Sequence, residues 1–142
     1  MISSRDYLSQ PEFLNLRNVR VFNLCKSYKY QTFGYYVSLL AEARRQKPIP
    51  NINTIQDIKS PTIIKLASEE LEDLIQQALS PLKEESFTLS IYFGKNIEQK
   101  YDKLASHLFK LFHAPFLRAQ FTFDKKWALQ NVYPISYNGI PD

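Results

Sequence analysis

The sequence predicts an α/β (α+β) fold in which a single mixed β-sheet is flanked by helices and closed by a C-terminal antiparallel hairpin. Two observations predict this class. Apolar stretches of strand length alternate with segments of helical periodicity, which is typical of crossover units and a partly parallel sheet. Near the C-terminus two strand-like stretches are separated only by a short polar turn, which favours an antiparallel hairpin.

The chain has the size and composition of one globular domain. It contains 142 residues, of which 44% are hydrophobic and 23% charged, and only three are glycine. This balance is typical of an ordered core and excludes a low-complexity chain. We therefore predict a single domain over residues 1–142, with an irregular lead-in over residues 1–16 that Pro11 interrupts.

The first half of the chain is predicted to alternate strands and helices. Residues 19–25 are apolar with little relief, as in a strand covered on both faces. Thr32 is a candidate N-cap for a helix that runs to residue 46. A weaker strand is expected at residues 49–55, and a helical stretch at residues 60–79 with a restart near residue 68. The predicted apolar stripe of the first helix consists of Phe33, Val37, Leu40 and Ala41.

The second half carries the clearest periodicities. Residues 87–94 alternate between apolar and polar side chains, which predicts a half-buried strand. Residues 97–113 have helical spacing of apolar side chains and form the clearest predicted helix. Two further strands, at residues 117–123 and 127–135, are joined by a tight turn at residues 124–126.

Charge, cysteine content and hydropathy restrict the class of protein. The net charge is +4, but the lysines are dispersed among acids, which is typical of a solvated surface and does not favour a nucleic-acid partner. A single cysteine excludes an internal disulfide and, with two distant histidines, matches no metal-ligand spacing. The N-terminus lacks a signal-peptide core, and no apolar run approaches a membrane span. We expect a cytoplasmic protein without a metal site.

The junction between the first strand and the following helix is the candidate binding site. A strand that leads into a helix N-terminus is where open α/β sheets bind ligands, and the free amides there favour anions. Lys26 and Lys29 add positive charge. Alternatively, these residues only cap the helix and fill the edge of the core. The candidate substrate-binding residues are Ser27, Tyr28, Tyr30, Thr32, Gly34, Tyr35 and Tyr36.

Cys25 is a candidate reactive thiol at the same junction. A thiol near a helix N-terminus can have a lowered pKa, but a nucleophile also needs a base within hydrogen-bond reach. His107 and His113 are the only histidines, and no sequence pattern brings either one to Cys25. A buried, inert thiol is the alternative. The apolar C-terminal hairpin around Trp127 is a further candidate, as an exposed docking surface.

The same residues resemble a known family. Leu24-Cys25-x-Ser27-Tyr28-x-Tyr30-x-x-x-Gly34-Tyr35-Tyr36 and the helical stretch that follows are similar to the N-terminal domain that precedes RimK-like ATP-grasp ligases (RLAN). Shorter segments at residues 54–57, 89–94, 104–109, 115–117 and 126–127 are similar as well. The resemblance extends from residue 19 to residue 136.

The resemblance implies an α+β accessory domain beside an ATP-grasp module that joins a carboxylate to an amine with ATP, in peptide biosynthesis or modification. ATP and Mg²⁺ are then expected only in a fused or partner ATP-grasp module, because residues 1–142 contain no such module. The implied role is non-catalytic binding of an amino-acid or peptide substrate. A docking or dimerisation module and a small thiol enzyme using Cys25 stay open as alternatives.

Overall fold

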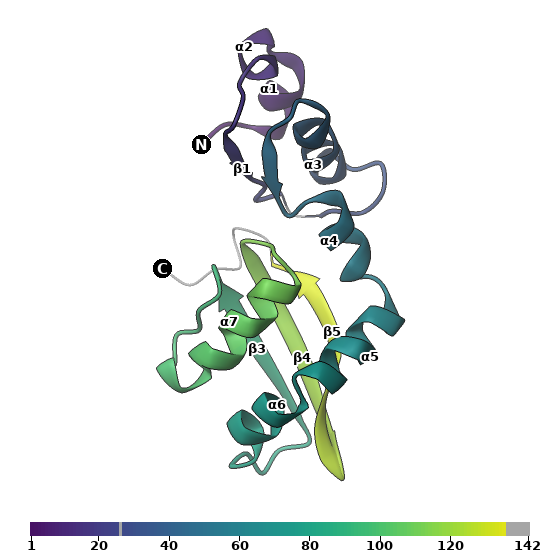
Figure 1. Ribbon diagram of the computed structural model, residues 1–142, viewed down its shortest axis with the longest axis vertical. Coiled ribbons are helices and arrows are strands. Elements are labelled where there is room, and N and C mark those ends of the chain that lie inside the picture. The colour runs from purple at the N-terminus through teal and green to yellow at the C-terminus, as the bar shows by residue number, and fades with distance from the viewer. Residues whose placement is uncertain (26, 136–142) are drawn as a thin grey trace.

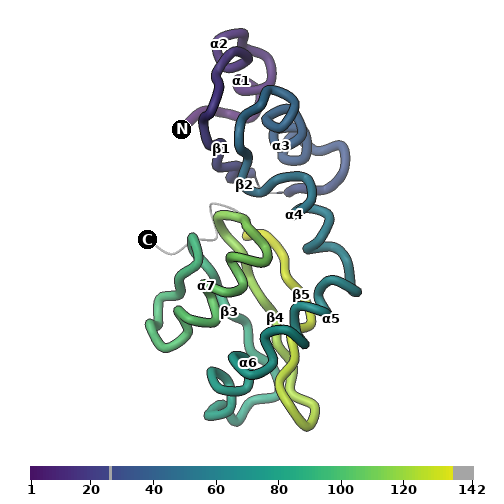
Figure 2. Tube along the Cα trace, viewed as in Figure 1, coloured from purple at the N-terminus to yellow at the C-terminus, as the bar shows by residue number. Residues whose placement is uncertain are grey.

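The chain combines helices with a parallel two-stranded sheet and an antiparallel three-stranded sheet, so the predicted α+β class is confirmed. The computed structural model describes residues 1–25 and 27–135. Figures 1 and 2 show two lobes joined by a helical connection, and we call residues 1–57 the N-terminal lobe and residues 58–135 the C-terminal lobe. The elements are α1 (Ser4–Ser9), α2 (Pro11–Leu14), β1 (Arg20–Phe22), α3 (Phe33–Ala43), β2 (Lys47–Ile49), α4 (Ile52–Asp57), α5 (Pro61–Glu70), α6 (Glu72–Leu79), β3 (Ser86–Tyr92), the 3-10 helix η1 (Gln99–Tyr101), α7 (Asp102–Leu111), β4 (Phe116–Asp124) and β5 (Lys126–Pro134).

The prediction of one mixed sheet is wrong, because the described strands form two sheets. In the N-terminal lobe β1 and β2 pair in parallel, and in the C-terminal lobe the strand order β3-β4-β5 is antiparallel throughout. The first two strands have only three residues each, and α4 and α5 then carry the chain away from them (Figure 1). The crossover around α3 therefore forms, but its sheet does not reach the later strands. The predicted C-terminal hairpin is confirmed.

The C-terminal lobe holds the larger core. Inward residues alternate along the strands, for example Leu89 and Ile91 on β3, and they join the apolar faces of α5, α6 and α7 in one cluster. This is the pattern of an antiparallel sheet with one covered face. The predicted apolar face of α7 is confirmed and comprises Tyr101, Leu104, Ala105, Leu108 and Phe112, all buried.

Helices replace the irregular lead-in that the sequence predicts for residues 1–16. The Ser3 side chain accepts a hydrogen bond from the Asp6 amide and begins α1, while Pro11 occupies the first turn of α2 instead of only ending a segment. Tyr7 of α1 is buried, and the Arg44 guanidinium lies 4.7 Å from the centre of its ring. Packing against α3 thus orders a segment whose own sequence signals are weak.

Three other boundaries differ from the predictions. The first strand is shorter than residues 19–25, because its partner β2 offers only three residues for pairing. The second strand lies at Lys47–Ile49 and not at residues 49–55, since Asn51 caps α4 there by accepting from the Thr54 amide at 2.8 Å. The helix expected at residues 97–113 begins as η1 and continues as α7.

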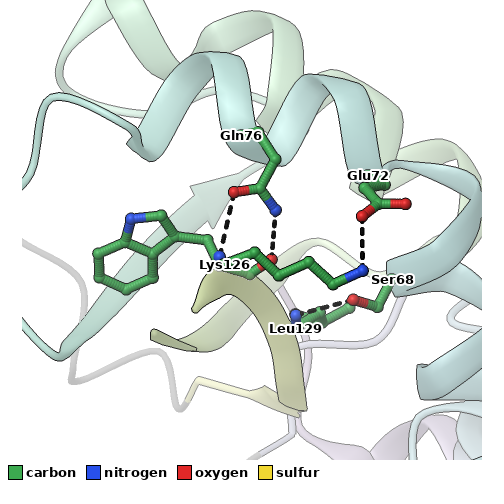
Figure 3. A network of polar contacts seen from close by, with 6 residues as sticks. Ser68, Glu72, Gln76, Lys126 and Leu129 are labelled. Carbon is green, nitrogen blue, oxygen red and sulfur yellow. Dashed lines mark hydrogen bonds and ion pairs between the residues drawn. The ribbon is translucent and has the colours of Figure 1, made fainter. Parts of the chain in front are cut away.

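Side chains of α5 and α6 cover the edge of β5. The Gln76 side chain accepts a hydrogen bond from the Trp127 amide at 3.0 Å and donates one to its carbonyl oxygen, and Ser68 accepts from the Leu129 amide (Figure 3). An exposed pair, Lys126 and Glu72, lies beside them. The helices therefore satisfy backbone groups that an edge strand would otherwise expose.

Candidate functional site

The predicted junction is held together by one buried side chain, Asn23. Its amide nitrogen donates to the Gly34 carbonyl oxygen at 2.7 Å and to the Ser38 hydroxyl at 2.8 Å, and its amide oxygen accepts from the Cys25 amide. Ser38 in turn donates to the Pro50 carbonyl oxygen at 2.6 Å. This network ties the end of β1 to α3 and to the segment after β2, so it fixes where the loop leaves the sheet.

Gly34 is required by a close backbone approach. A Cβ atom at this position would lie 1.9 Å from the Ser27 carbonyl oxygen and 2.9 Å from the Cys25 Cβ. The Ser27 carbonyl oxygen accepts from the Thr32 hydroxyl at 3.2 Å, and the Cys25 amide donates to Asn23, so movement of either group would weaken a hydrogen bond of the loop. The glycine therefore lets the loop lie directly on the first turn of α3.

Tyr28 supports the loop from inside. Its side chain is only 4% exposed, and its hydroxyl donates to the Asn23 carbonyl oxygen at 2.5 Å. Burial, with a smaller contribution from the nearby Cys25, raises the pKa of Tyr28 far above its ordinary value. The Tyr28 carbonyl oxygen also accepts from Lys59 at 3.1 Å. The Tyr28 side chain therefore supports the loop and is not available to a ligand.

The other three tyrosines form a contiguous surface in which Tyr30 and Tyr36 are exposed and Tyr35 is half-buried. The rings of Tyr30 and Tyr35 meet edge to face with centroids 5.3 Å apart, and those of Tyr35 and Tyr36 at 5.8 Å. Tyr30 is 69% exposed. None of these three hydroxyls forms a hydrogen bond with a described residue. We call Tyr30, Tyr35 and Tyr36 the tyrosine surface.

The remaining polar candidates at the junction make local hydrogen bonds. Thr32 is the predicted N-cap: its hydroxyl accepts from the Tyr35 amide and donates to the Lys29 carbonyl oxygen at 2.7 Å. The Ser27 hydroxyl accepts from the Lys29 amide at 3.2 Å. Lys26 lies outside the described residues. The structure thus brings the predicted residues together and separates them into a supporting set and an exposed set.

Cys25 lies half-buried at the start of the loop. Burial raises the pKa of its thiol, an effect that the adjacent Ser4 side chain only partly opposes. An activated thiol needs the opposite shift. Both histidines belong to the C-terminal lobe, where His107 bonds the Lys103 carbonyl oxygen and His113 packs on Phe109.

Two cavities border other parts of the molecule. One of about 460 Å³ runs between α5 and β5, beside Lys65, Glu69 and Lys126. The other, of about 630 Å³, lies between the N-terminal segment and β1 and reaches Cys25. Neither is lined by a residue of the tyrosine surface. Within residues 1–25 and 27–135, no three His, Cys, Asp or Glu side chains gather into a potential metal site.

Sequence reasoning missed Asn23 and misplaced two apolar surfaces. An asparagine at the end of an apolar strand was the available signal for a buried polar contact. Trp127 is 2% exposed, so the expectation of an exposed patch around it is wrong: Trp127 packs in the core below Gln76. Conversely, α3 buries Gly34 and Ser38 and leaves Phe33, expected in its apolar stripe, exposed.

Comparison with known proteins decides the family. A family model of the RimK-like ATP-grasp N-terminal domain matches residues 4–142. The chain belongs to this family. The match confirms the resemblance seen in the sequence, and membership implies association with an ATP-grasp module.

Two further comparisons with this RimK-like ATP-grasp N-terminal domain found no match. No curated protein and no solved structure matches the chain. In the part of the chain that the structure describes, every helix is too short or too polar to cross a bilayer.

Proposed function

We propose that this chain is the non-catalytic, substrate-binding domain of a RimK-like ATP-grasp carboxylate–amine ligase, acting in peptide biosynthesis or modification in the cytoplasm. The tyrosine surface contacts the amino-acid or peptide substrate beside the catalytic module. Asn23, Gly34 and Tyr28 hold the loop that presents it. ATP and Mg²⁺ are expected in the ATP-grasp module with which this family of domains is associated.

The observation that carries this proposal is the contrast among the four tyrosines. Tyr28 uses its hydroxyl inside the protein, whereas the rings of the tyrosine surface lie in a contiguous row in which Tyr30 and Tyr36 are exposed. None of the hydroxyls in this row forms a hydrogen bond with a described residue. Tyrosine offers apolar area and a polar tip at low conformational cost, which suits binding of polar, partly apolar ligands such as amino acids.

Steady-state kinetics of the ATP-grasp-containing protein test the proposal. Replacing Tyr30, Tyr35 and Tyr36 by phenylalanine removes three hydroxyls and keeps the rings. We expect KM for the carboxylate or amine substrate to rise by about tenfold or more, at roughly 0.5–1.5 kcal/mol per lost hydrogen bond, with KM for ATP unchanged. The matched control is Leu66→Ala, an exposed apolar residue on α5. Unchanged substrate KM in the triple variant rejects a substrate-binding role.

A docking role is the second candidate, and one face of α3 favours it. Phe33, Tyr36 and Leu39 recur at intervals of three residues on this helix and are all exposed, Phe33 by 54%. Exposed apolar side chains on one face mark protein–protein contacts. Replacing Phe33 and Leu39 by serine is then expected to weaken association with the ATP-grasp module, or with a second copy of the chain, without changing substrate KM. Unchanged association would exclude docking through this face.

We further propose that the two lobes act as a single domain. They meet through Phe22 and Phe93, whose rings are 5.5 Å apart edge to face, and through the hydrogen bond from Lys59 to Tyr28. Unfolding followed by Trp127 fluorescence, which reports the C-terminal lobe, and by Cys25 accessibility, which reports the N-terminal lobe, is expected to give coincident transitions. Separate midpoints would show two domains.

A further inference from the structure

The cavity beside Cys25 is bordered by the N-terminal segment, α1, α2 and β1. Its volume of about 630 Å³ is in the range of small-molecule sites, roughly 300–1,000 Å³. None of the residues of the tyrosine surface lines it. Its apolar wall is contributed by Met1, Ile2, Phe13, Leu16, Val19, Val21, Phe22, Leu24 and Val37.

Three polar side chains that line this cavity, those of Tyr7, Asn23 and Gln46, are engaged in hydrogen bonds within the protein. Tyr7 donates to the Gln46 side chain, whose nitrogen donates to the Phe13 and Leu16 carbonyl oxygens at 2.8 and 3.1 Å. Asn23 is fully occupied by the loop network. Ser3 caps α1, so a ligand in the interior meets apolar groups, the Cys25 thiol and the small Ser4 hydroxyl. The buried part of such a ligand must therefore be largely apolar.

Exposed apolar side chains gather at the same place. Met1, Ile2, Leu16 and Phe22 all border the cavity and are each exposed by 43% or more. Isolated exposed apolar residues are ordinary, but a group of them around a concave apolar space indicates a binding site.

The charge at the cavity is positive. Among the described residues that line it, Arg20 is the one cationic side chain and none is acidic. Lys47 is the register partner of Arg20 in the parallel pair of β1 and β2, and both residues are exposed. Neither forms an ion pair with a described residue. A ligand with an apolar body and an anionic end complements this arrangement.

We propose that this cavity binds a carboxylate that carries an apolar chain, with the chain between β1 and the N-terminal segment and the carboxylate beside Arg20. Two sources share this chemistry: a free aliphatic acid and the C-terminus of a peptide that ends in apolar residues. The proposal does not depend on the tyrosine surface, and it adds a second binding site to the domain.

The test is calorimetric titration of the 142-residue chain with decanoate and, as the uncharged match, decanol. We expect saturable decanoate binding at one site, and protection of Cys25 from N-ethylmaleimide in the same concentration range. Arg20→Gln is expected to weaken decanoate binding by up to about fivefold, which is the effect of losing one exposed ion pair. Decanol binding is expected to stay unchanged. The control is Arg5→Gln, which removes an exposed cationic side chain that does not line the cavity.

A second variant addresses the cavity itself. Leu16→Glu places an acid at an exposed lining position, where it cannot disturb the core, and is expected to weaken decanoate by tenfold or more through like-charge repulsion. Absence of saturable decanoate binding, binding that leaves Cys25 labelling unchanged, or equal losses in Arg20→Gln and Arg5→Gln would each overturn the proposal. Acetyl-Leu-Leu and its C-terminal amide decide the source: preferential binding of the acid form supports the peptide C-terminus, and decanoate binding alone supports the aliphatic acid.

Discussion

Replacing Gly34 by alanine separates loop packing from helix propensity at the start of α3. Propensity alone predicts stabilisation, by up to about 1 kcal/mol for alanine over glycine in a helix. The structure predicts the opposite sign, because the new Cβ would lie 1.9 Å from the Ser27 carbonyl oxygen. Overpacking of this kind costs roughly 1–3 kcal/mol, and displacing the helix also weakens the hydrogen bond from Asn23, worth about 1 kcal/mol. The net expectation is destabilisation by about 1–3 kcal/mol.

Urea unfolding followed by circular dichroism measures this difference as a shift in midpoint at constant slope. Leu39→Gly compared with Leu39→Ala, at an exposed position of the same helix, calibrates the propensity contribution. A Gly34→Ala variant as stable as the wild type, or more stable, would refute the close packing of the loop on α3.

Three further predictions follow from buried or paired groups. Burial raises the pKa of Tyr28, so this tyrosine ionises at lower pH in the unfolded chain than in the folded one, and the free energy of unfolding should fall above about pH 10. In urea melts at increasing pH, Tyr28→Phe should show a smaller fall in that free energy than the wild type. An identical fall would contradict the raised pKa of Tyr28. Cys25 should react with iodoacetamide at pH 7 more slowly than a cysteine peptide, and faster labelling would restore the thiol-enzyme alternative. Gln76→Ala removes two hydrogen bonds to the backbone of β5 and should lower the free energy of unfolding by about 1–3 kcal/mol. Lys126→Ala removes only an exposed ion pair and should lower it by under about 1 kcal/mol. Comparable losses of stability in thermal melts would argue against protection of the β5 edge by Gln76.

Local patterns in the sequence predicted the elements whose signals are local. The alternation in β3, the Thr32 cap of α3 and the helical face around Leu104 depend on residues within one element, and each is found in the structure. The C-terminal hairpin was predictable for the same reason, because its turn and both strands are contiguous.

The arrangement of the sheets was not predictable from such patterns. Whether β2 joins β3 depends on the direction in which α4 and α5 carry the chain, which is set by tertiary packing. The helix α1 likewise depends on a distant partner, since Arg44 donates to the Tyr7 carbonyl oxygen at 2.9 Å across 37 positions of sequence. No periodicity within residues 1–16 reports that contact.

For the candidate site, the sequence located the junction but could not divide its residues by role. The sequence alone does not distinguish which of the four tyrosines near Gly34 is buried and which are exposed. Only the structure shows that Tyr28 turns inward to the Asn23 carbonyl oxygen while Tyr30 turns to solvent. Side-chain direction in an irregular loop depends on backbone conformation, which no repeat pattern encodes.

Oxidative footprinting of the tyrosine rings in the ATP-grasp-containing protein tests the central claim most directly. Mass spectrometry would compare the oxidation of Tyr30, Tyr35 and Tyr36 with and without saturating carboxylate and amine substrates. Exposed Phe123 of the C-terminal hairpin serves as the internal reference. We predict that substrate protects the three tyrosines and leaves Phe123 unchanged. Equal oxidation of the three tyrosines in both states would contradict a substrate-binding role for this surface.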